Sequence, residues 1–332
     1  MRQRLTTTSA IDLEQDPIVL PSSAFYRVGE NEFGVPGLIA IESVGPFVPV
    51  QSVGPFFMIH DSYWQPGFGI GHHPHRTNER LFYIVRGRVE HDDALNGIKG
   101  TMGEGDLGRL TEGLKGMFHQ EWNGAPGEIS HAFILVYRPD AEPPIPSAEF
   151  AVLRAADRPV YEEADGVETS ELVGPRSPFR VNLSTMRLFA DSKLRPGAEL
   201  TFSLGADEGV VVYPLEGRVE LDEAVERASS DMAASGLPPA HWRAEPAPGT
   251  LGPSSGGPGG GAGREGAASG SAAHGNPVIL SAEGSVHPEG PREVAVAFGR
   301  EGGRPMRLLC PDGPARVIRV VFSSTESGLV IA

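Results

Sequence analysis

Short apolar runs separated by turn residues dominate the first half of the chain. They read LIAIESV, FFMIH, LFYIVRGRVEH and ISHAFILVY, at residues 38–44, 56–60, 81–91 and 129–137. Runs of this length that are rich in β-branched and aromatic residues, and are bounded by Gly, Pro and Asn, are typical of antiparallel strands. No long segment with a helical period competes with them, so the pattern predicts an all-β sandwich or barrel.

A second set of apolar runs follows a proline-rich stretch, PDAEPPIPSAEF, which starts at Pro139. Each proline removes a backbone donor and restricts the residue before it. We therefore expect a connector at 140–179 between a first domain at 37–139 and a second at 180–324, with an N-terminal tail at 1–36. The later runs lie at residues 181–194, 199–204, 209–221, 277–282, 292–299, 306–310 and 315–324.

The two halves share a short internal repeat. YIVRGRVE, which starts at Tyr83, and YPLEGRVE, which starts at Tyr213, agree at Tyr, Gly, Arg, Val and Glu and lie 130 residues apart. Each copy falls in the middle of a β-rich half. The repeat therefore indicates two copies of one β-domain, which also accounts for a chain of 332 residues, too long for one core of ordinary size.

Residues 223–277 interrupt the pattern of the second domain. Their central part reads APGTLGPSSGGPGGGAGREGAASGSAAHGN, which has too few apolar groups to offset the entropy lost on ordering it. We expect a disordered insertion here. The second domain can tolerate such a segment because the free-energy cost of closing a loop grows only slowly with its length.

The overall composition excludes several functional classes. The net charge is −15 and no basic block is present, so direct binding to nucleic acid is not expected. No apolar run is long enough to cross a membrane, and the first residues lack the apolar run of a secretory signal. Because Cys310 is the single cysteine, the chain cannot form an internal disulfide. We expect Cys310 to pack as a small, buried apolar side chain. We expect a cytoplasmic protein.

Histidines are concentrated in the first domain. Side chains at positions i and i+2 of a strand share a face, so His73 and His75 point together and His72 points to the other side. His73 and His75 are therefore the pair that can meet one ion. The histidines of this domain are His60, His72, His73, His75, His91, His119 and His131, seven of the ten in the chain.

A second pair of metal-binding side chains has the same spacing. His119 and Glu121 are separated by one residue and follow a turn-rich segment. On neighbouring strands of a barrel, the two pairs would supply three imidazoles and one carboxylate. With coordination positions left open, such a set suits Fe(II), Mn(II), Ni(II) or Cu(II) better than a closed structural zinc.

The segments HPHRTNERLFY, VEHDD, GEGD and HQEW follow one another in an order that resembles the pirin family of the cupin superfamily. The resemblance implies two cupin domains in tandem, each a jelly-roll β-barrel, with the disordered insertion in the second. It also implies that His73, His75, His119 and Glu121 are iron ligands. Fe(II) is thus the expected metal, and Mn, Ni, Cu and Zn are alternatives.

The chain departs from the family pattern near these ligands. Thr77 and Asn78 replace the Gly-Phe that follows HPHR in pirins, and the stretch from Thr111 to His119 is one residue longer. Both changes leave the four ligands in place. They alter the wall of the pocket and therefore bear on which substrate fits there.

Two further residues of the first domain have positions near the ligands. Glu79 stands where many other cupins have a metal-binding glutamate, so we expect it to contact a ligand, to replace one, or to carry a proton. His91 matches a family position beside the site and is either a partner of the ligands or an ordinary sheet histidine. In the second domain, the positions 130 residues after His73, His75 and Glu79 hold Ser203, Gly205 and Gly209. We therefore expect the second cupin to be metal-free.

The pirin resemblance implies an activity of the quercetin 2,3-dioxygenase type. The metal would anchor a flavonol-like or other bidentate hydroxy-carbonyl molecule, dioxygen would attack it, and Glu121 or Glu79 would handle the proton. The alternative is a non-enzymatic regulatory protein that senses iron or redox state and binds a protein partner. The acidic composition favours a basic protein over DNA as that partner.

Overall fold

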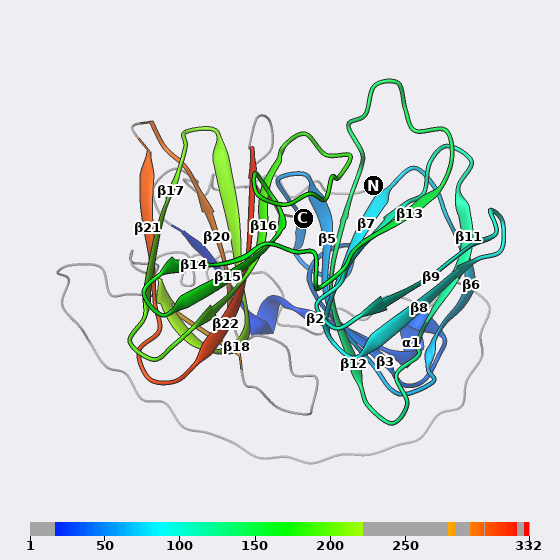
Figure 1. The fold of residues 1–332 in the computed structure, drawn as a ribbon, viewed down its shortest axis with the longest axis horizontal. Coiled ribbons are helices and arrows are strands. Elements are labelled where there is room, and N and C mark those ends of the chain that lie inside the picture. Colours follow the sequence, from blue (N-terminus) through cyan, green and yellow to red (C-terminus); the bar gives the residue numbers. More distant parts are fainter. Residues whose placement is uncertain (1–16, 222–277, 283–292, 302, 324–328, 332) are drawn as a thin grey trace, which may run out of the picture.

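The chain forms two β-barrels that lie side by side (Figure 1). The all-β, two-cupin architecture predicted from the sequence is confirmed. No helix among the described residues is long and apolar enough to cross a membrane. The insertion predicted at 223–277 lies outside the described residues. A computed structural model describes residues 17–221, 278–282, 293–301, 303–323 and 329–331.

The first barrel consists of two antiparallel sheets. In order of hydrogen bonding, the larger sheet contains β13 (Glu149–Leu153), β10 (Leu107–Thr111), β7 (Glu79–Arg86), β12 (Ser130–Tyr137), β5 (Phe56–Trp64), β3 (Leu38–Val44) and β2 (Tyr26–Val28). The smaller sheet contains β6 (Gly69–His75), β11 (Met117–Asn123), β8 (Arg88–Asp93) and β9 (Ile98–Gly103). Short elements complete this barrel: η1 (Ser22–Ala24), α1 (Glu30–Phe33) and β4 (Val50–Val53).

The second barrel repeats this arrangement. Its main row of strands is β1 (Ile18–Pro21), β20 (Glu293–Phe298), β18 (Glu208–Leu221), β22 (Ala315–Ser323), β16 (Met186–Leu194), β15 (Val167–Val173) and β14 (Val160–Ala164). Its second row contains β17 (Glu199–Leu204), β21 (Arg304–Leu309) and β19 (Val278–Ala282). The long strand β18 contributes to both rows, because its second half pairs with β19 and β21.

Strands near the two ends of the chain cross between the barrels. β1 pairs with β20 of the second barrel, and β23 (Leu329–Ile331) pairs with β4 of the first. Part of the predicted N-terminal tail therefore lies within a sheet. Three strands, β13, β14 and β15, also lie in the stretch predicted as a connector. Its first prolines, Pro143, Pro144 and Pro146, all precede β13, so they leave the rest of that stretch free to pair.

The internal repeat occupies equivalent places in the two barrels. Gly87, between β7 and β8, and Gly217, within β18, have φ values of 78° and 71°. A Cβ atom on Gly87 would lie 2.6 Å from the Ser130 hydroxyl oxygen, and one on Gly217 would lie 2.2 Å from the Pro314 carbonyl oxygen. Both the conformation and the space therefore require glycine, which explains why this residue of the repeat is kept in both copies.

The larger sheets of the two barrels meet at a shared apolar core. Phe133 of the first barrel packs against Tyr213 and Phe189 of the second, with ring centroids 4.8 and 6.1 Å apart. Phe56 and Phe322 meet edge to face at 5.7 Å. Each barrel also has an apolar core of its own. The barrels are therefore joined by a continuous hydrophobic interface in addition to the chain.

A buried polar pair crosses this interface, and its two residue types recur at equivalent positions. The Tyr83 hydroxyl donates to Asp191 of the second barrel at 2.5 Å, and Arg316 donates to the same carboxylate at 2.8 Å. In the mirrored position, burial and the negative charge of Asp61 raise the pKa of Tyr213 well above its usual value. Asp61 and Asp191 are 130 residues apart, as Tyr83 and Tyr213 are. The duplicated units therefore place the same two residue types, a tyrosine and an aspartate, at equivalent positions of the interface.

We predict that Asp191→Ala destabilises the protein by about 3 kcal/mol. The change leaves the Arg316 guanidinium and the Tyr83 hydroxyl without their shared acceptor at a buried interface. Urea unfolding measures the loss. Asp165→Ala is the control, because Asp165 is fully exposed and should change the free energy of unfolding by less than about 0.5 kcal/mol. Equal, small changes in both variants would contradict the prediction.

Candidate metal centre

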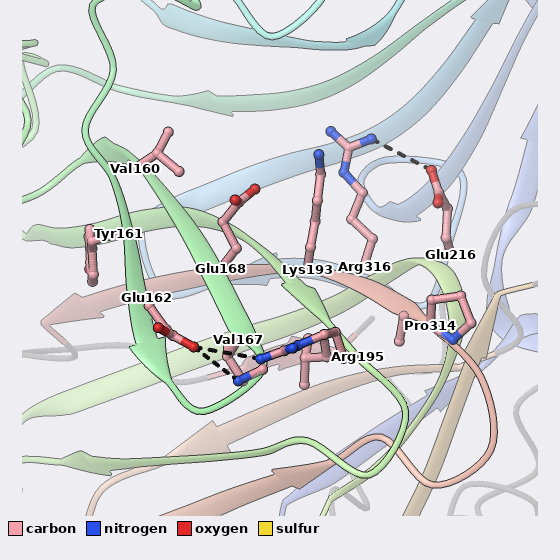
Figure 2. Close-up of a pocket in the computed structure, with 13 residues that line it drawn as sticks. Val160, Tyr161, Glu162, Val167, Glu168, Lys193, Arg195, Glu216, Pro314 and Arg316 are labelled. Carbon is pink, nitrogen blue, oxygen red and sulfur yellow. Dashed lines mark hydrogen bonds and ion pairs between the residues drawn. The ribbon is translucent and has the colours of Figure 1, made fainter.

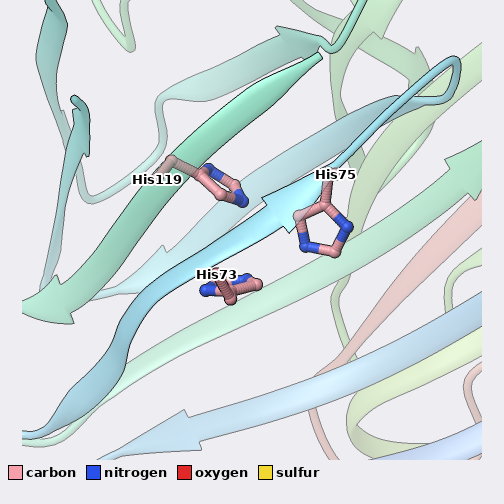
Figure 3. A group of neighbouring side chains, drawn as sticks. All are labelled: His73, His75 and His119. Atoms are coloured by element: carbon pink, nitrogen blue, oxygen red, sulfur yellow. The ribbon is translucent and has the colours of Figure 1, made fainter. Parts of the chain in front are cut away.

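Antiparallel pairing of β6 with β11 brings three imidazoles together. His119 lies directly opposite His73, and Met117 lies opposite His75. The ring centroids of His73 are 4.7 Å from those of His75 and His119, and the last two are 5.0 Å apart. Figure 3 shows the three rings converging on one point between the strands. One ring nitrogen of each lies within 4.8 Å of the others.

Glu121 completes the group predicted from the sequence. It lies two residues beyond His119 on β11 and therefore on the same face. Its carboxylate oxygens are 3.9 Å from His73 Nε2 and 3.3 Å from His119 Nδ1. A register irregularity between β6 and β11 falls at this point of the strand. Glu121 therefore lies beside two of the three imidazoles, those of His73 and His119.

His91 adjoins the group from the neighbouring strand β8, where it is paired with Glu121. Its Nδ1 is 3.3 Å from Nδ1 of His119, and its ring stacks on Phe150 at 5.0 Å with an interplanar angle of 9°. His91, His119 and Glu121 form a second set of side chains able to hold a metal. His91 therefore restricts the orientation of the His119 ring through a contact at its Nδ1.

The hydrogen bonds of His73 and His119 fit a metal-binding role. Nδ1 of His73 donates to the Gly71 carbonyl oxygen at 2.7 Å, so the lone pair of Nε2 is free for a metal. Nε2 of His119 is buried and has no hydrogen-bond partner among the described residues. A buried nitrogen of this kind requires a partner, and a metal ion would satisfy it. The residues present therefore fit a divalent metal with nitrogen and oxygen ligands.

Burial sets the charge state of these side chains. It lowers the pKa of His73, of His119 and of His75, the last to about 3, and it lowers that of His91 to about 4. The imidazoles are therefore neutral near pH 7, which is the state that binds metals. Burial also raises the pKa of Glu121 to about 7, with Arg80 opposing the shift and Glu112 adding to it.

Glu79 does not lie with the ligands, contrary to the expectation from other cupins. Its carboxylate is fully buried and accepts hydrogen bonds from the hydroxyl groups of Thr111 and Tyr137. It also accepts two from Asn182, through the backbone N–H at 2.9 Å and the side-chain amide at 2.6 Å. Successive side chains of a strand face opposite ways, and the neighbouring Arg80 is the one that faces the histidines. Glu79 therefore joins the first barrel to the segment leading into the second.

Two charged residues contact the histidine site but were not among the site residues predicted from the sequence. The Arg80 guanidinium donates to His75 Nδ1 at 2.7 Å and to the Glu112 carboxylate at 2.9 Å. Glu112 is fully buried and also accepts the backbone N–H of Asn78 at 2.8 Å. Strand alternation could have located Arg80, because it follows Glu79 and must face the other side. Glu112 follows β10 in a loop, where no periodic signal exists.

The Thr77 position is strained. Thr77 has φ 72°, and it is the one non-glycine residue with positive φ among those described. A β-branched residue in this region is a genuine outlier. Its N–H donates to the Gly113 carbonyl oxygen at 3.1 Å, which ties the bend after His75 to the loop that carries Glu112. This is the place where the pirin pattern has glycine.

His72 points away from the ligands, as strand alternation predicted. Its ring stacks on that of the exposed Phe118 at 5.3 Å, on the other face of β6 and β11. Among the described residues, both groups able to hold a metal lie in the first barrel. His72 is a member of neither.

A large cleft lies elsewhere, in the second barrel (Figure 2). Its volume is about 770 Å³, and neither histidine nor cysteine lines it. Acidic and basic side chains balance one another there, and Arg195 and Arg316 contact Glu162 and Glu216. The charged side chains that line the cleft are Glu162, Glu168, Lys193, Arg195, Glu216 and Arg316. The cleft lacks the chemistry of the histidine site, and the two are distinct.

Known protein sequences resemble the first barrel. The Pirin family model matches residues 30–135. Pirin-like protein 2 of Arabidopsis thaliana is 30% identical over 155 residues, which cover 46% of this chain and 46% of that protein. Quercetin 2,3-dioxygenase of Escherichia coli (strain K12) is 32% identical over 83 residues, which cover 25% of this chain and 35% of that protein. The matches thus span about half or less of these relatives.

Solved structures share the fold over nearly the whole chain. A quercetin 2,3-dioxygenase from Acinetobacter baumannii has a TM-score of 0.62 at 16% identity, covering 94% of this chain and 88% of that one. A bacterial pirin from Escherichia coli, solved in complex with nickel(II), has a TM-score of 0.54 at 14% identity, covering 89% and 98%. At these identities the likeness shows the fold. Together with the sequence matches, it confirms the resemblance inferred from the motifs.

We predict that Thr77→Gly stabilises the protein by about 0.5 kcal/mol. Glycine removes the strain of a β-branched residue at positive φ, and its greater freedom in the unfolded chain offsets part of the gain. Thermal and urea unfolding measure the change. Thr201→Gly, at an exposed position of β17, is the control and should lose about 0.5–1 kcal/mol. A similar loss in both variants would show that Thr77 is not strained.

We predict that the metal-free protein loses stability relative to Glu121→Gln as the pH rises from 5 to 8. The folded-state pKa of Glu121, about 7, lies above its ordinary value of 4.5. Its contribution is therefore fully present below about pH 4.5 and is lost as the pH passes through 7. The amide does not titrate, so the difference should grow by on the order of 3 kcal/mol. Urea unfolding with a chelator measures it, and parallel pH profiles would refute it.

Proposed function

We propose that the chain, whose first barrel matches the Pirin family model, is an Fe(II)-dependent dioxygenase. The substrate would be a flavonol-like or other bidentate hydroxy-carbonyl molecule, with dioxygen as co-substrate. The observation that carries the proposal is the convergence of His73, His75 and His119, with the Glu121 carboxylate beside His73 and His119. Three imidazoles and one carboxylate leave coordination positions open for a small molecule.

The exposure of the ligands is consistent with access from one side. The His73 and His75 side chains are 25% and 23% exposed, whereas that of His119 is fully buried. A ligand molecule would therefore approach over β6 and find His119 and Glu121 at the bottom of the site. The buried floor excludes water from the side opposite the entrance, which strengthens electrostatic interactions there.

The chain's own residues have separate tasks in this proposal. A bound Fe(II) would supply Lewis acidity and redox chemistry toward dioxygen. His73 and His119 would hold it through neutral imidazoles, with His91 fixing the ring of His119. Glu121, which lies beside His73 and His119, would hold the metal or take the proton of a substrate hydroxyl. Glu79 neither binds the metal nor carries a proton in this proposal, because both of its oxygens accept hydrogen bonds elsewhere.

Two further observations support the substrate and metal classes. The Escherichia coli relative named quercetin 2,3-dioxygenase is 32% identical over its matched segment. The nitrogen and oxygen donor set suits Fe(II) and also Mn, Ni, Cu or Zn, since affinity alone does not select among them. Metal analysis of protein purified without added metal therefore comes first. Oxygen consumption is then measured with anaerobically iron-loaded protein and a panel of flavonols and enediols.

We predict that His73→Ala and His119→Ala each abolish stoichiometric metal binding and reduce oxygen consumption at least about 100-fold. His72→Ala is the matched control, since it removes an adjacent imidazole that stacks outside the site. It should retain both metal and activity. Iron-loaded wild-type protein that keeps its metal but consumes no oxygen with any substrate of the panel would refute the dioxygenase and favour the regulatory alternative.

A further inference from the structure

The hydrogen bond from Arg80 determines which nitrogen of His75 carries its hydrogen. Arginine has only donors, so Nδ1 of His75 must accept the bond from the guanidinium at 2.7 Å. A neutral imidazole has one donor and one acceptor. Burial keeps this ring neutral by lowering its pKa to about 3. In this arrangement the hydrogen of His75 is therefore on Nε2.

A ring nitrogen that carries a hydrogen has no lone pair for a metal. His75 in this state cannot bind through Nε2, while its Nδ1 is engaged by Arg80. His73, on the same face of the same strand, is in the opposite state, because its Nδ1 donates to Gly71 and its Nε2 is free. Of the two histidines, only His73 therefore has a lone pair on Nε2 that is free to bind a metal.

The acceptor that His75 needs for metal binding is close by. The carboxylate of Glu112 is fully buried and lies 3.9 Å from His75 Nδ1. In the structure it accepts a hydrogen bond from the Nε–H group of Arg80. A small shift of the Arg80 guanidinium away from His75 would let Nδ1–H donate to Glu112. The ring hydrogen would then move from Nε2 to Nδ1 with no net gain or loss of a proton.

We propose that Arg80 and Glu112 control metal occupancy by competing for Nδ1 of His75, which makes them positioning residues for the site. Arg80 holds the ring in the metal-free tautomer, and Glu112 accepts its hydrogen when Nε2 binds a metal. The positive charge of Arg80 beside the ligands also opposes a divalent cation, and the negative charge of Glu112 favours one. This inference rests on the proposed metal-dependent function.

The first test is metal affinity, measured with Zn²⁺ in competition with a chelator. Arg80→Met should raise the affinity about 10- to 100-fold, and Glu112→Gln should lower it by a similar factor. Arg86→Met is the matched control. It removes the same charge from the same strand, but its side chain is 60% exposed and pairs only distantly with Glu128. It should stay within about twofold of wild type.

Arg80→Met leaves the buried Glu112 carboxylate without its cation, so this variant can fail to fold. The double variant Arg80→Met/Glu112→Gln has no unpaired buried charge. It should bind Zn²⁺ about 10-fold more tightly than Glu112→Gln alone. Equal affinities in that pair, or an equal effect of Arg80→Met and Arg86→Met, would overturn the proposal.

The second test reads the tautomer directly. Long-range ¹H–¹⁵N spectra of histidine-labelled protein should place the hydrogen of His75 on Nε2 in the metal-free wild type, and on Nδ1 in the Zn²⁺-loaded form. A hydrogen on Nδ1 in the metal-free wild type would refute the role of Arg80. If wild-type protein bound no Zn²⁺, the proposed function would fail, whereas the metal-free spectrum would still test Arg80.

Discussion

The face-to-face packing of the two large sheets gives the central strands of the first barrel two buried sides. Strand β7 shows the consequence most clearly. Its odd residues Leu81 and Tyr83 belong to the core shared by the barrels, and its even residues Phe82 and Ile84 belong to the inner core of the first barrel. A slip of one residue would exchange these sets. The position of every side chain on this strand, including those at the histidine site, depends on that alternation.

The same alternation explains how far the sequence could predict the site. Spacing at i and i+2 was sufficient to select His73 with His75 and to group His119 with Glu121, because each pair lies on one strand. The all-β fold also followed from local patterns. The role of Glu79 could not be predicted in this way. It depends on which face of β7 the second barrel covers, and that is a long-range property of the fold.

Two other features of the structure could not be predicted from local sequence patterns, for related reasons. The contact of Glu112 with Arg80 joins a loop to a strand 32 residues away, and the loop position of Glu112 has no periodic signal. The pairing of β1 with the second barrel and of β23 with the first joins segments from opposite parts of the sequence. The repeat indicated two domains, but it did not indicate that they exchange edge strands. Local patterns thus predicted the elements, and long-range pairing decided their partners.

The exchange of edge strands has a consequence for how the molecule holds together. Each barrel relies on a strand from the far part of the chain, so the link between the barrels does not pass through the connector alone. Cutting the connector would leave two pieces still joined by β1, by β23 and by the shared core. We therefore expect the two halves of this duplicated chain to unfold together, and the common framework leaves one half free to diverge in chemistry.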